Sequence, residues 1–510
     1  MAARFAHVNR VTGEYVRTAD DTAMKLAGLT MTQVRAYLVQ QAGRALAAAC
    51  TVAIRYSSVR RQGFDHSPKT ATLGRTDEHA VWDYPTQRMR LLPLLASAYC
   101  YHVGGVKLGQ LLRRAELSVG DGSVSPELLA ELHATSSGLK AITTGTAGDG
   151  IETCRRACGG HGYLQASGLP GLLGTYLQSV TVEGDNFLLP QQTTKFLLNV
   201  LEAIRATSPA TLPPRAPRNQ GASRPGHAGP EGHAKGAARF KGLPESCTYL
   251  AAYVESEHGG APMACSALGP QDLLSARALQ RLLDSRAGRL VVQVEKLLAR
   301  LLTSQTRPTD EEEGRGLSFH EAWTSSLVEV GRASSAHCEA HLFRTFNDFV
   351  MEETEKAVRG DGDGSGLGVG PSAEAGGGSA GLRDLGCLES LGRLVLLHGL
   401  QLVSDSLSDH LEAGTLSPAQ AQMVREAQRQ LVLGEDGRGD SLLAGDALAL
   451  CDAWDLADRQ LQNSTLGRRD GMVYEAVLEA AQRSTLNTEL ALDSYRHLVR
   501  PLDLDPQPRL

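Results

Sequence analysis

Long apolar runs and aromatic residues are scarce in this 510-residue chain. The longest apolar run, residues 91–101, is well below the ~18 residues that a membrane-spanning helix needs, so we expect no membrane span. Aromatic residues make up 5% of the chain, whereas β-rich folds are usually rich in aromatic and β-branched residues. The abundance of Leu, Ala, Arg, Gln and Glu favours helix, and the hydrophobic share of 42% excludes wholesale disorder.

A basic charge balance, a signal peptide and paired cysteines are also lacking. The formal net charge of -6 argues against nucleic acid as a main partner, because phosphate-binding proteins usually present a basic face. The first ten residues, MAARFAHVNR, contain no apolar signal-peptide core. The nine cysteines are scattered, which predicts free thiols in a reducing compartment. Cys154 and Cys158 form the one close pair, so we predict no metal site.

Two low-complexity segments divide the chain. Residues 205–241 are rich in Pro, Gly, Ala and Arg, with seven basic residues and one acid, and too few apolar residues to offset the entropy of ordering them. We interpret this segment as a disordered linker, although a nucleic-acid-binding arm has the same composition. Residues 360–381 contain ten glycines, which predicts a flexible loop.

The remaining sequence predicts helices. Apolar residues recur at helical spacing over 31–60, 89–117 and a run that starts at Ser125 and Pro126 and ends at the glycines 159–160. A stripe of Leu and Val covers 290–301, and further amphipathic runs cover 317–359, 383–413, 418–434, 443–462, 470–484 and 488–499. Strand patterns are rare, and the first 18 residues alone suggest a hairpin fragment.

The fold class predicted from these patterns is all-α, with two helical bundles behind a short β remnant. The predicted domains are a β remnant at 1–18, a first helical domain at 19–204, the linker at 205–241, a second helical domain at 242–500 and a tail at 501–510.

Residues 151–198 contain the two motifs that suggest chemistry. The motif CGGHGY at 158–163 ends a helix in a glycine turn, which is either an ordinary helix end or a place where backbone approaches a ligand. The motif EGDN at 183–186 precedes an apolar helical run, with Asp185 or Asn186 as its cap and Pro190 inside it as a possible kink. Glu183 is then either a solvated loop residue or a general base near the start of a helix.

Taken together, these motifs resemble the acyl-CoA oxidases, a branch of the acyl-CoA dehydrogenase superfamily. The motifs that carry the resemblance, in the order of the family, are RYSSVRRQ at 55–62, ELHA at 131–134, SGLKA at 137–141, CGGHGY at 158–163, SGLP at 167–170, EGDN at 183–186, DAWDLAD at 452–458 and DGMVYE at 470–475. The two low-complexity segments are not part of the resemblance.

The resemblance implies an FAD enzyme that oxidises fatty acyl-CoA to trans-2-enoyl-CoA and reduces O2 to H2O2. Glu183 matches the base that removes the α-proton, and Arg60 matches an arginine at the FAD phosphates. Gly160 and Asp185 match positions near the adenine or ribose of FAD, on a neighbouring subunit of a homodimer, and His161 is interpreted as structural. The long region after residue 241 favours the oxidase branch over the dehydrogenases, which lack a second C-terminal helical domain.

The sequence also departs from the family. Its members carry an N-terminal helical domain and a β-domain before the equivalent of Met1, so we expect this chain alone to bind FAD weakly or not at all. Gly63 stands where the family has Phe or a polar residue, which leaves the course of that loop open. The alternatives are an acyl-CoA oxidase represented by a partial chain, a non-catalytic relative that dimerises or binds a partner, and a dehydrogenase.

The final residues suggest a location. Arg509 and Leu510 satisfy the last two positions of a Ser-Lys-Leu type import signal, although Pro508 is unusual at the first position. Because the family is mainly peroxisomal, we expect import into the peroxisome.

Overall fold

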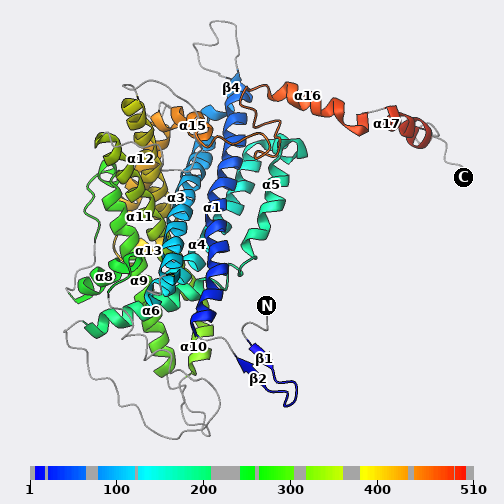
Figure 1. Cartoon of the computed structure of the whole chain (residues 1–510). Helices are drawn as coiled ribbons and strands as arrows, with labels where there is room; N and C mark the ends of the chain where they lie inside the picture. Colours follow the sequence, from blue (N-terminus) through cyan, green and yellow to red (C-terminus); the bar gives the residue numbers. More distant parts are fainter. Residues whose placement is uncertain are drawn as a thin grey trace, which may run out of the picture. The chain divides into compact units, whose positions relative to one another are not determined.

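The structure is a computed structural model that describes residues 6–17, 21–64, 78–120, 125–207, 242–258, 264–303, 317–359, 380–434, 441–487 and 489–500 (Figure 1). The described residues are mostly helical, and the predicted all-α fold class is confirmed. The linker and loop predicted at 205–241 and 360–381 lie almost wholly outside the described residues, apart from the ends of two helices, and the tail at 501–510 lies wholly outside them. Among the described helices, none is long and apolar enough to cross a bilayer.

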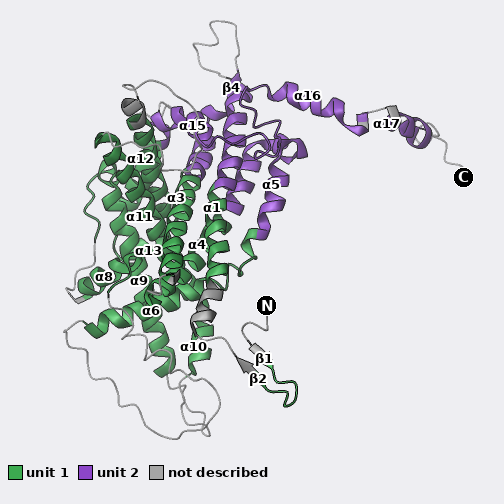
Figure 2. Cartoon of the chain, viewed as in Figure 1, with its two compact units in different colours: residues 1–43, 96–146, 179–431 green, residues 44–95, 147–178, 432–510 purple. Residues whose placement is uncertain are grey.

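The chain forms two compact units, each assembled from separate stretches of sequence (Figure 2). Unit 1 comprises residues 1–43, 96–146 and 179–431, and unit 2 comprises residues 44–95, 147–178 and 432–510. Three long helices contribute to both units, namely α1 (Asp21–Val59), α3 (Pro85–Gly120) and α4 (Pro126–Ala157). The predicted domain limits at 204 and 242 stay a prediction.

Unit 1 contains most of the remaining helices. They are α6 (Pro190–Thr207), α8 (Thr248–His258), α9 (Ala276–Thr303), α10 (Phe319–Ser325), α11 (Leu327–Arg359), α12 (Ala380–Asp405), α13 (Leu407–Glu412) and α14 (Pro418–Leu433), whose last two residues belong to unit 2. Helix α11 packs against α9, α12 and α6, and its apolar face is buried from Val330 to Val350. Gly399 of α12 lies directly against the ring of Phe343, so the two helices approach more closely than a larger residue would allow.

Unit 2 contains shorter elements. They are β3 (Arg61–Phe64), β4 (Glu78–Ala80), the 3₁₀ turns Gly159–Tyr163 and Gln165–Ser167, α5 (Leu169–Tyr176), α15 (Leu442–Asp452), α16 (Val473–Arg483), α17 (Glu489–Ser494) and a π-helical turn at Tyr495–Val499. Arg55 of α1 binds Asp452 at 2.6 Å and donates to the carbonyl of Gly467 at 2.7 Å. This side chain therefore fastens the C-terminal part of the sequence to α1.

Two short antiparallel sheets complete the described structure. Strands β1 (Ala6–Val8) and β2 (Tyr15–Arg17) form the predicted hairpin, with Val8 opposite Tyr15. Strands β3 and β4 form a second pair that the sequence analysis missed. Gly63 adopts φ +89° at the irregular register of this pair, which is the backbone region that glycine reaches most easily. This conformation accounts for a glycine at the position where the course of the loop was open.

Two expected helix features are corrected. Pro190 does not kink a helix, because it is the first residue of α6, where a missing N–H costs nothing. The amphipathic run expected at 443–462 is helical only as far as Asp452. Beyond it the chain turns, with Asp455, Gln462 and Asn463 at positive φ.

Candidate functional site

The first group of candidate residues lies in unit 1, on the segment 181–189 that precedes α6. Glu183 has φ +58° and Gly184 has φ +113°, so two successive residues have left-handed backbone. A residue with a side chain rarely adopts this region, and holding it there costs on the order of 1 kcal/mol or more. The surrounding residues must therefore stabilise the turn.

Two buried cations bind the backbone of this segment. Arg35 of α1 donates from Nε to the carbonyl oxygen of Glu183 at 2.9 Å and from Nη1 to Ser137 Oγ at 3.1 Å. Lys140 of α4, which is 0% exposed, donates from Nζ to the carbonyl oxygen of Gly184 at 2.7 Å. Both carbonyls of the left-handed turn are thus held by positive charges.

Asn186 links the same segment to α4. Its Oδ1 accepts from Lys140 Nζ at 2.9 Å, and its Nδ2 donates to Thr144 Oγ1 at 3.0 Å. Asp185 accepts at Oδ1 from the backbone N–H of Phe187 at 2.8 Å. The expectation that Asp185 or Asn186 caps the following helix is therefore wrong, since both side chains are used within the loop or on α4, and the helix begins only at Pro190.

The Glu183 carboxylate itself makes no hydrogen bond or ion pair with a described residue. Arg35 and Lys140 still act on it through their charges. Burial lowers the pKa of Lys140 to about 8, with Asp185 and Glu183 opposing the change and Arg35 adding to it. Burial also lowers the pKa of Arg35. Glu183 is therefore half-buried near two partly desolvated cations, and its carboxylate has no hydrogen-bond partner among the described residues.

The second group of candidate residues lies in unit 2. Arg60 directly follows α1 and donates from Nη1 to the hydroxyl of Tyr474 at 3.1 Å. Nearby, the hydroxyl of Tyr56 and Nδ1 of His161 are 2.8 Å apart, and the ring centroids of His161 and Tyr474 are 6.5 Å apart. Burial raises the pKa of Tyr56 to about 12, so its hydroxyl stays protonated at neutral pH.

Gly160 lies in the 3₁₀ turn beside this aromatic group. It is exposed, and no described heavy atom lies within 4 Å of the position that a Cβ would take. The preceding Gly159 has φ +60°, which turns the chain at the end of α4. The turn therefore presents open backbone beside His161, whose ring lies near Tyr474, the partner of Arg60.

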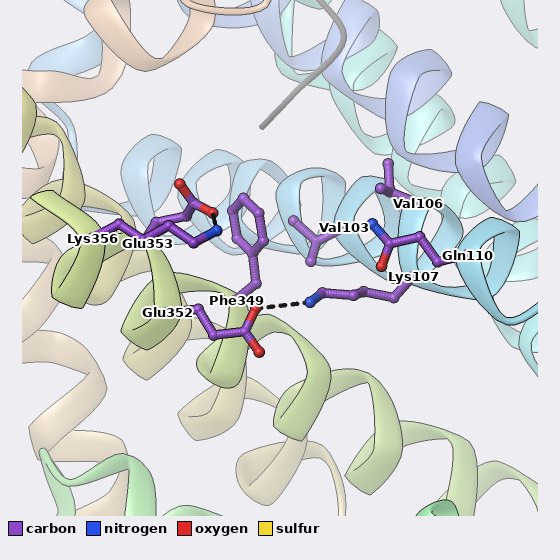
Figure 3. A pocket seen from close by; sticks show the side chains of 8 residues that line it. All are labelled: Val103, Val106, Lys107, Gln110, Phe349, Glu352, Glu353 and Lys356. Carbon is purple, nitrogen blue, oxygen red and sulfur yellow. Dashed lines mark hydrogen bonds and ion pairs between the residues drawn. The ribbon is translucent and has the colours of Figure 1, made fainter. Parts of the chain in front are cut away.

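Figure 3 shows a separate pocket in unit 1, between α3 and α11, with about 440 Å³ of empty space. Val103, Val106 and Phe349 form part of its lining. Its lysines pair with its own glutamates, since Lys107 binds Glu352 at 2.9 Å and Lys356 binds Glu353 at 2.8 Å. These pairs leave no excess charge for a phosphate or a carboxylate, and none of the predicted site residues lines the pocket.

The sequence analysis missed Arg35 and Lys140. The signal for Lys140 was a lysine at a position that α4 buries, inside a motif that was noted without assigning the lysine a role. Arg35 lies 148 positions before Glu183, so nothing local in the sequence indicates their contact. All nine cysteines carry free thiols, and among the described residues no three His, Cys, Asp or Glu side chains are placed to hold a metal.

Two family models match the parts of the chain that contain these candidate residues. Residues 29–198 match the family model "Acyl-CoA oxidase, C-alpha1 domain", and residues 381–503 match the family model "Acyl-CoA oxidase". The chain belongs to the acyl-CoA oxidase family. The first match includes the segment of Glu183, and the second includes the stretch of unit 2 that contains Asp452 and Tyr474.

Curated relatives match along nearly the whole chain. Peroxisomal acyl-coenzyme A oxidase 1 from Rattus norvegicus is 31% identical over 502 residues, which are 98% of this chain. The Homo sapiens protein of the same name is 30% identical over 499 residues. In both cases the match covers 61% of the relative, so the chain spans about three fifths of the length of these proteins.

Solved acyl-CoA oxidases share the fold. The tomato enzyme superimposes with a TM-score of 0.71 at 27% identity, covering 98% of this chain and 61% of that one. Acyl-CoA oxidase-2 from Caenorhabditis elegans, bound with FAD, ascaroside-CoA and ATP, gives a TM-score of 0.70 at 27% identity, covering 98% of this chain and 59% of that one. The helical architecture is therefore that of the acyl-CoA oxidases.

Proposed function

We propose that this chain functions as an acyl-CoA oxidase that converts fatty acyl-CoA to trans-2-enoyl-CoA while O2 is reduced to H2O2. The observation that carries the proposal is the Glu183 carboxylate, whose segment is held through its backbone while the carboxylate keeps no partner among the described residues. A general base needs a fixed position and a free lone pair, and Glu183 has both.

Glu183 removes the α-proton of the thioester. That proton is weakly acidic, so the carboxylate must be held at a fixed place beside the α-carbon to take it. Exposed apolar side chains flank Glu183, with Val182 at 41% and Phe187 at 91% exposure, and they suit contact with an acyl chain. FAD, held by the ligands proposed below, would supply the acceptor for the β-hydride and the chemistry by which O2 is reduced.

The proposed FAD ligands are Arg60, Gly160 and Asp185. The Arg60 guanidinium is half-buried, and its fork suits a phosphate at fixed geometry. Gly160 offers exposed backbone, and Asp185 keeps Oδ2 available because Oδ1 accepts from the Phe187 amide. Arg60 and Gly160 belong to unit 2 and Asp185 to unit 1. In the proposed homodimer, Arg60 would meet the FAD phosphates, and Gly160 and Asp185 would meet the adenine or ribose of FAD from the neighbouring subunit.

The oxidase branch is favoured over the dehydrogenases. The match of residues 381–503 to the acyl-CoA oxidase family model supports this choice, because the dehydrogenases lack a second C-terminal helical domain. We propose a homodimer located in the peroxisome, in keeping with the peroxisomal names of the relatives. The proposed import signal at the C-terminus lies outside the described residues.

The direct test supplies the purified chain with excess FAD and palmitoyl-CoA in air and measures H2O2 and trans-2-enoyl-CoA. We expect equal amounts of both products. Enoyl-CoA formed only with an added electron acceptor would indicate a dehydrogenase, and neither product from a chain that a flavin titration shows to be loaded with FAD would favour the non-catalytic relative. Flavin absorbance after purification tests separately whether the chain alone binds FAD weakly.

A further inference from the structure

The most costly feature near the proposed base is the burial of two cations. Lys140 is 0% exposed and Arg35 is 5% exposed, and among the described residues neither forms an ion pair with a carboxylate. Buried charges are ordinarily paired, because desolvation of an isolated ammonium or guanidinium is expensive. Here the two cations donate hydrogen bonds to carbonyl and amide oxygens of one short segment, and Arg35 also donates to Ser137.

The geometry of that segment shows what the cations stabilise. Glu183 and Gly184 both have left-handed backbone, and each of their carbonyl oxygens receives one of the two cations, at 2.9 Å and 2.7 Å. The cations come from different helices, α1 and α4, so they fix the turn from two directions. Gly184 also packs directly against Leu189, which restricts the turn further.

We propose that Arg35 and Lys140 are positioning residues that clamp the left-handed backbone at Glu183 and Gly184 and thereby aim the Glu183 carboxylate at the α-carbon of the substrate. Asn186 completes the clamp through its hydrogen bonds to Lys140 and Thr144. The importance of this clamp for catalysis rests on the proposed role of Glu183, whereas its effect on the backbone does not.

If the two cations only held the helices together, replacing them would loosen the helices as well as the segment of Glu183. Arg35 also binds Ser137 on α4, so its loss would loosen the contact between α1 and α4 as a whole. A clamp acts locally, on the amides of Asn186, Leu188 and Leu189, which donate to Val180 and Asp185 within the segment. Hydrogen exchange at these amides separates the two cases without FAD or substrate.

The test compares amide hydrogen exchange in the full chain and in Lys140→Met, Arg35→Met and Arg35→Lys. Loss of one charged donor should accelerate exchange across 180–189 by about tenfold, while peptides from α4 and α6 keep their wild-type rates. Arg35→Lys keeps the charge but not both hydrogen bonds, so it should give a smaller, equally local acceleration. Lys107→Met, which removes an outer lysine of the same unit, is the matched control and should leave the segment unchanged.

Two outcomes would overturn the clamp: wild-type exchange at 180–189 in Lys140→Met, or equal acceleration throughout α4 and α6. If Lys140→Met does not fold, Arg35→Lys decides, and wild-type rates there would equally overturn it. In FAD-saturated chain the clamp also predicts a fall in kcat for Arg35→Met with little change in KM, partly restored in Arg35→Lys. Wild-type chain that forms no peroxide would refute the proposed oxidase function but leave the exchange result intact.

Discussion

Asp409 of α13 connects three helices of unit 1 through buried ion pairs, and replacing it with Asn tests this packing directly. Its carboxylate, 6% exposed, binds Arg286 Nε of α9 at 2.7 Å and also contacts Arg332 of α11. Arg289 of α9 donates to the Asp409 carbonyl oxygen at 2.8 Å. Burial alone would raise the pKa of Asp409, but the hydrogen bonds and charges of Arg286 and Arg332 outweigh it and lower the pKa.

The size of the effect follows from which partners are buried. The side chain of Arg332 is 48% exposed, so water screens its attraction to Asp409. The side chains of Arg286 and Arg289 are only 11% and 13% exposed, so their attraction to Asp409 is screened much less. Asp409→Asn preserves the shape but removes the charge facing these arginines, and loss of one member of a buried pair costs about 3–5 kcal/mol. For a domain of this size, that corresponds to a fall in Tm of roughly 5–10 °C.

Urea and thermal unfolding measured by circular dichroism provide the assay. Glu412→Gln is the matched control, because Glu412 is 64% exposed and 3.9 Å from Arg289, and its loss should cost less than about 1 kcal/mol. If Asp409→Asn loses no more stability than Glu412→Gln, the view that this buried cluster holds α9, α11 and α13 together is refuted.

Two further predictions concern other charged groups. Arg55→Met leaves the Gly467 carbonyl without its donor and leaves Asp452 with only the exposed Arg469, at 3.3 Å, as a partner. It should lower the free energy of unfolding by about 2–4 kcal/mol in urea, whereas a loss below about 1 kcal/mol would contradict the anchoring role. The pKa of Lys140 is about 8 in the folded chain, against its ordinary value of 10.5. Between these two pH values the unfolded chain binds more protons than the folded chain, so the free energy of unfolding should rise with pH. The rise should be about 3 kcal/mol larger in the wild type than in Lys140→Met. Parallel pH profiles of wild type and Lys140→Met would contradict this.

Much of the fold could be predicted from the sequence because long helices repeat one signal many times. The run expected at 31–60 is helical to Val59, and the start expected at Ser125 is confirmed by its hydroxyl, which accepts from the Leu128 amide at 3.2 Å. Strands β3 and β4 escaped prediction because each is only a few residues long and one contains Gly63. Short elements of this kind depend on pairing, which a periodicity analysis does not detect.

The candidate site could be predicted only in part. The local pattern left Glu183 as either a loop residue or a base, and the resemblance to the acyl-CoA oxidases gave the roles of Glu183 and Asp185, which stay predictions. The clamp depends on contacts across 148 and 44 positions, made by Arg35 and Lys140, and no short motif encodes such distances. The left-handed φ of Glu183 was equally hidden, since glutamate has no preference for that conformation.

The measurement that tests the central claim most directly is the rate of peroxide formation from palmitoyl-CoA by Glu183→Gln, with FAD in excess. The amide keeps the shape of the carboxylate but cannot take a proton, so the rate should fall by at least about a hundredfold while FAD binding is unchanged. Glu116→Gln, an exposed position on α3 of the same unit, is the control and should keep the wild-type rate. A Glu183→Gln rate within about twofold of the wild type would contradict the assignment of Glu183 as the base.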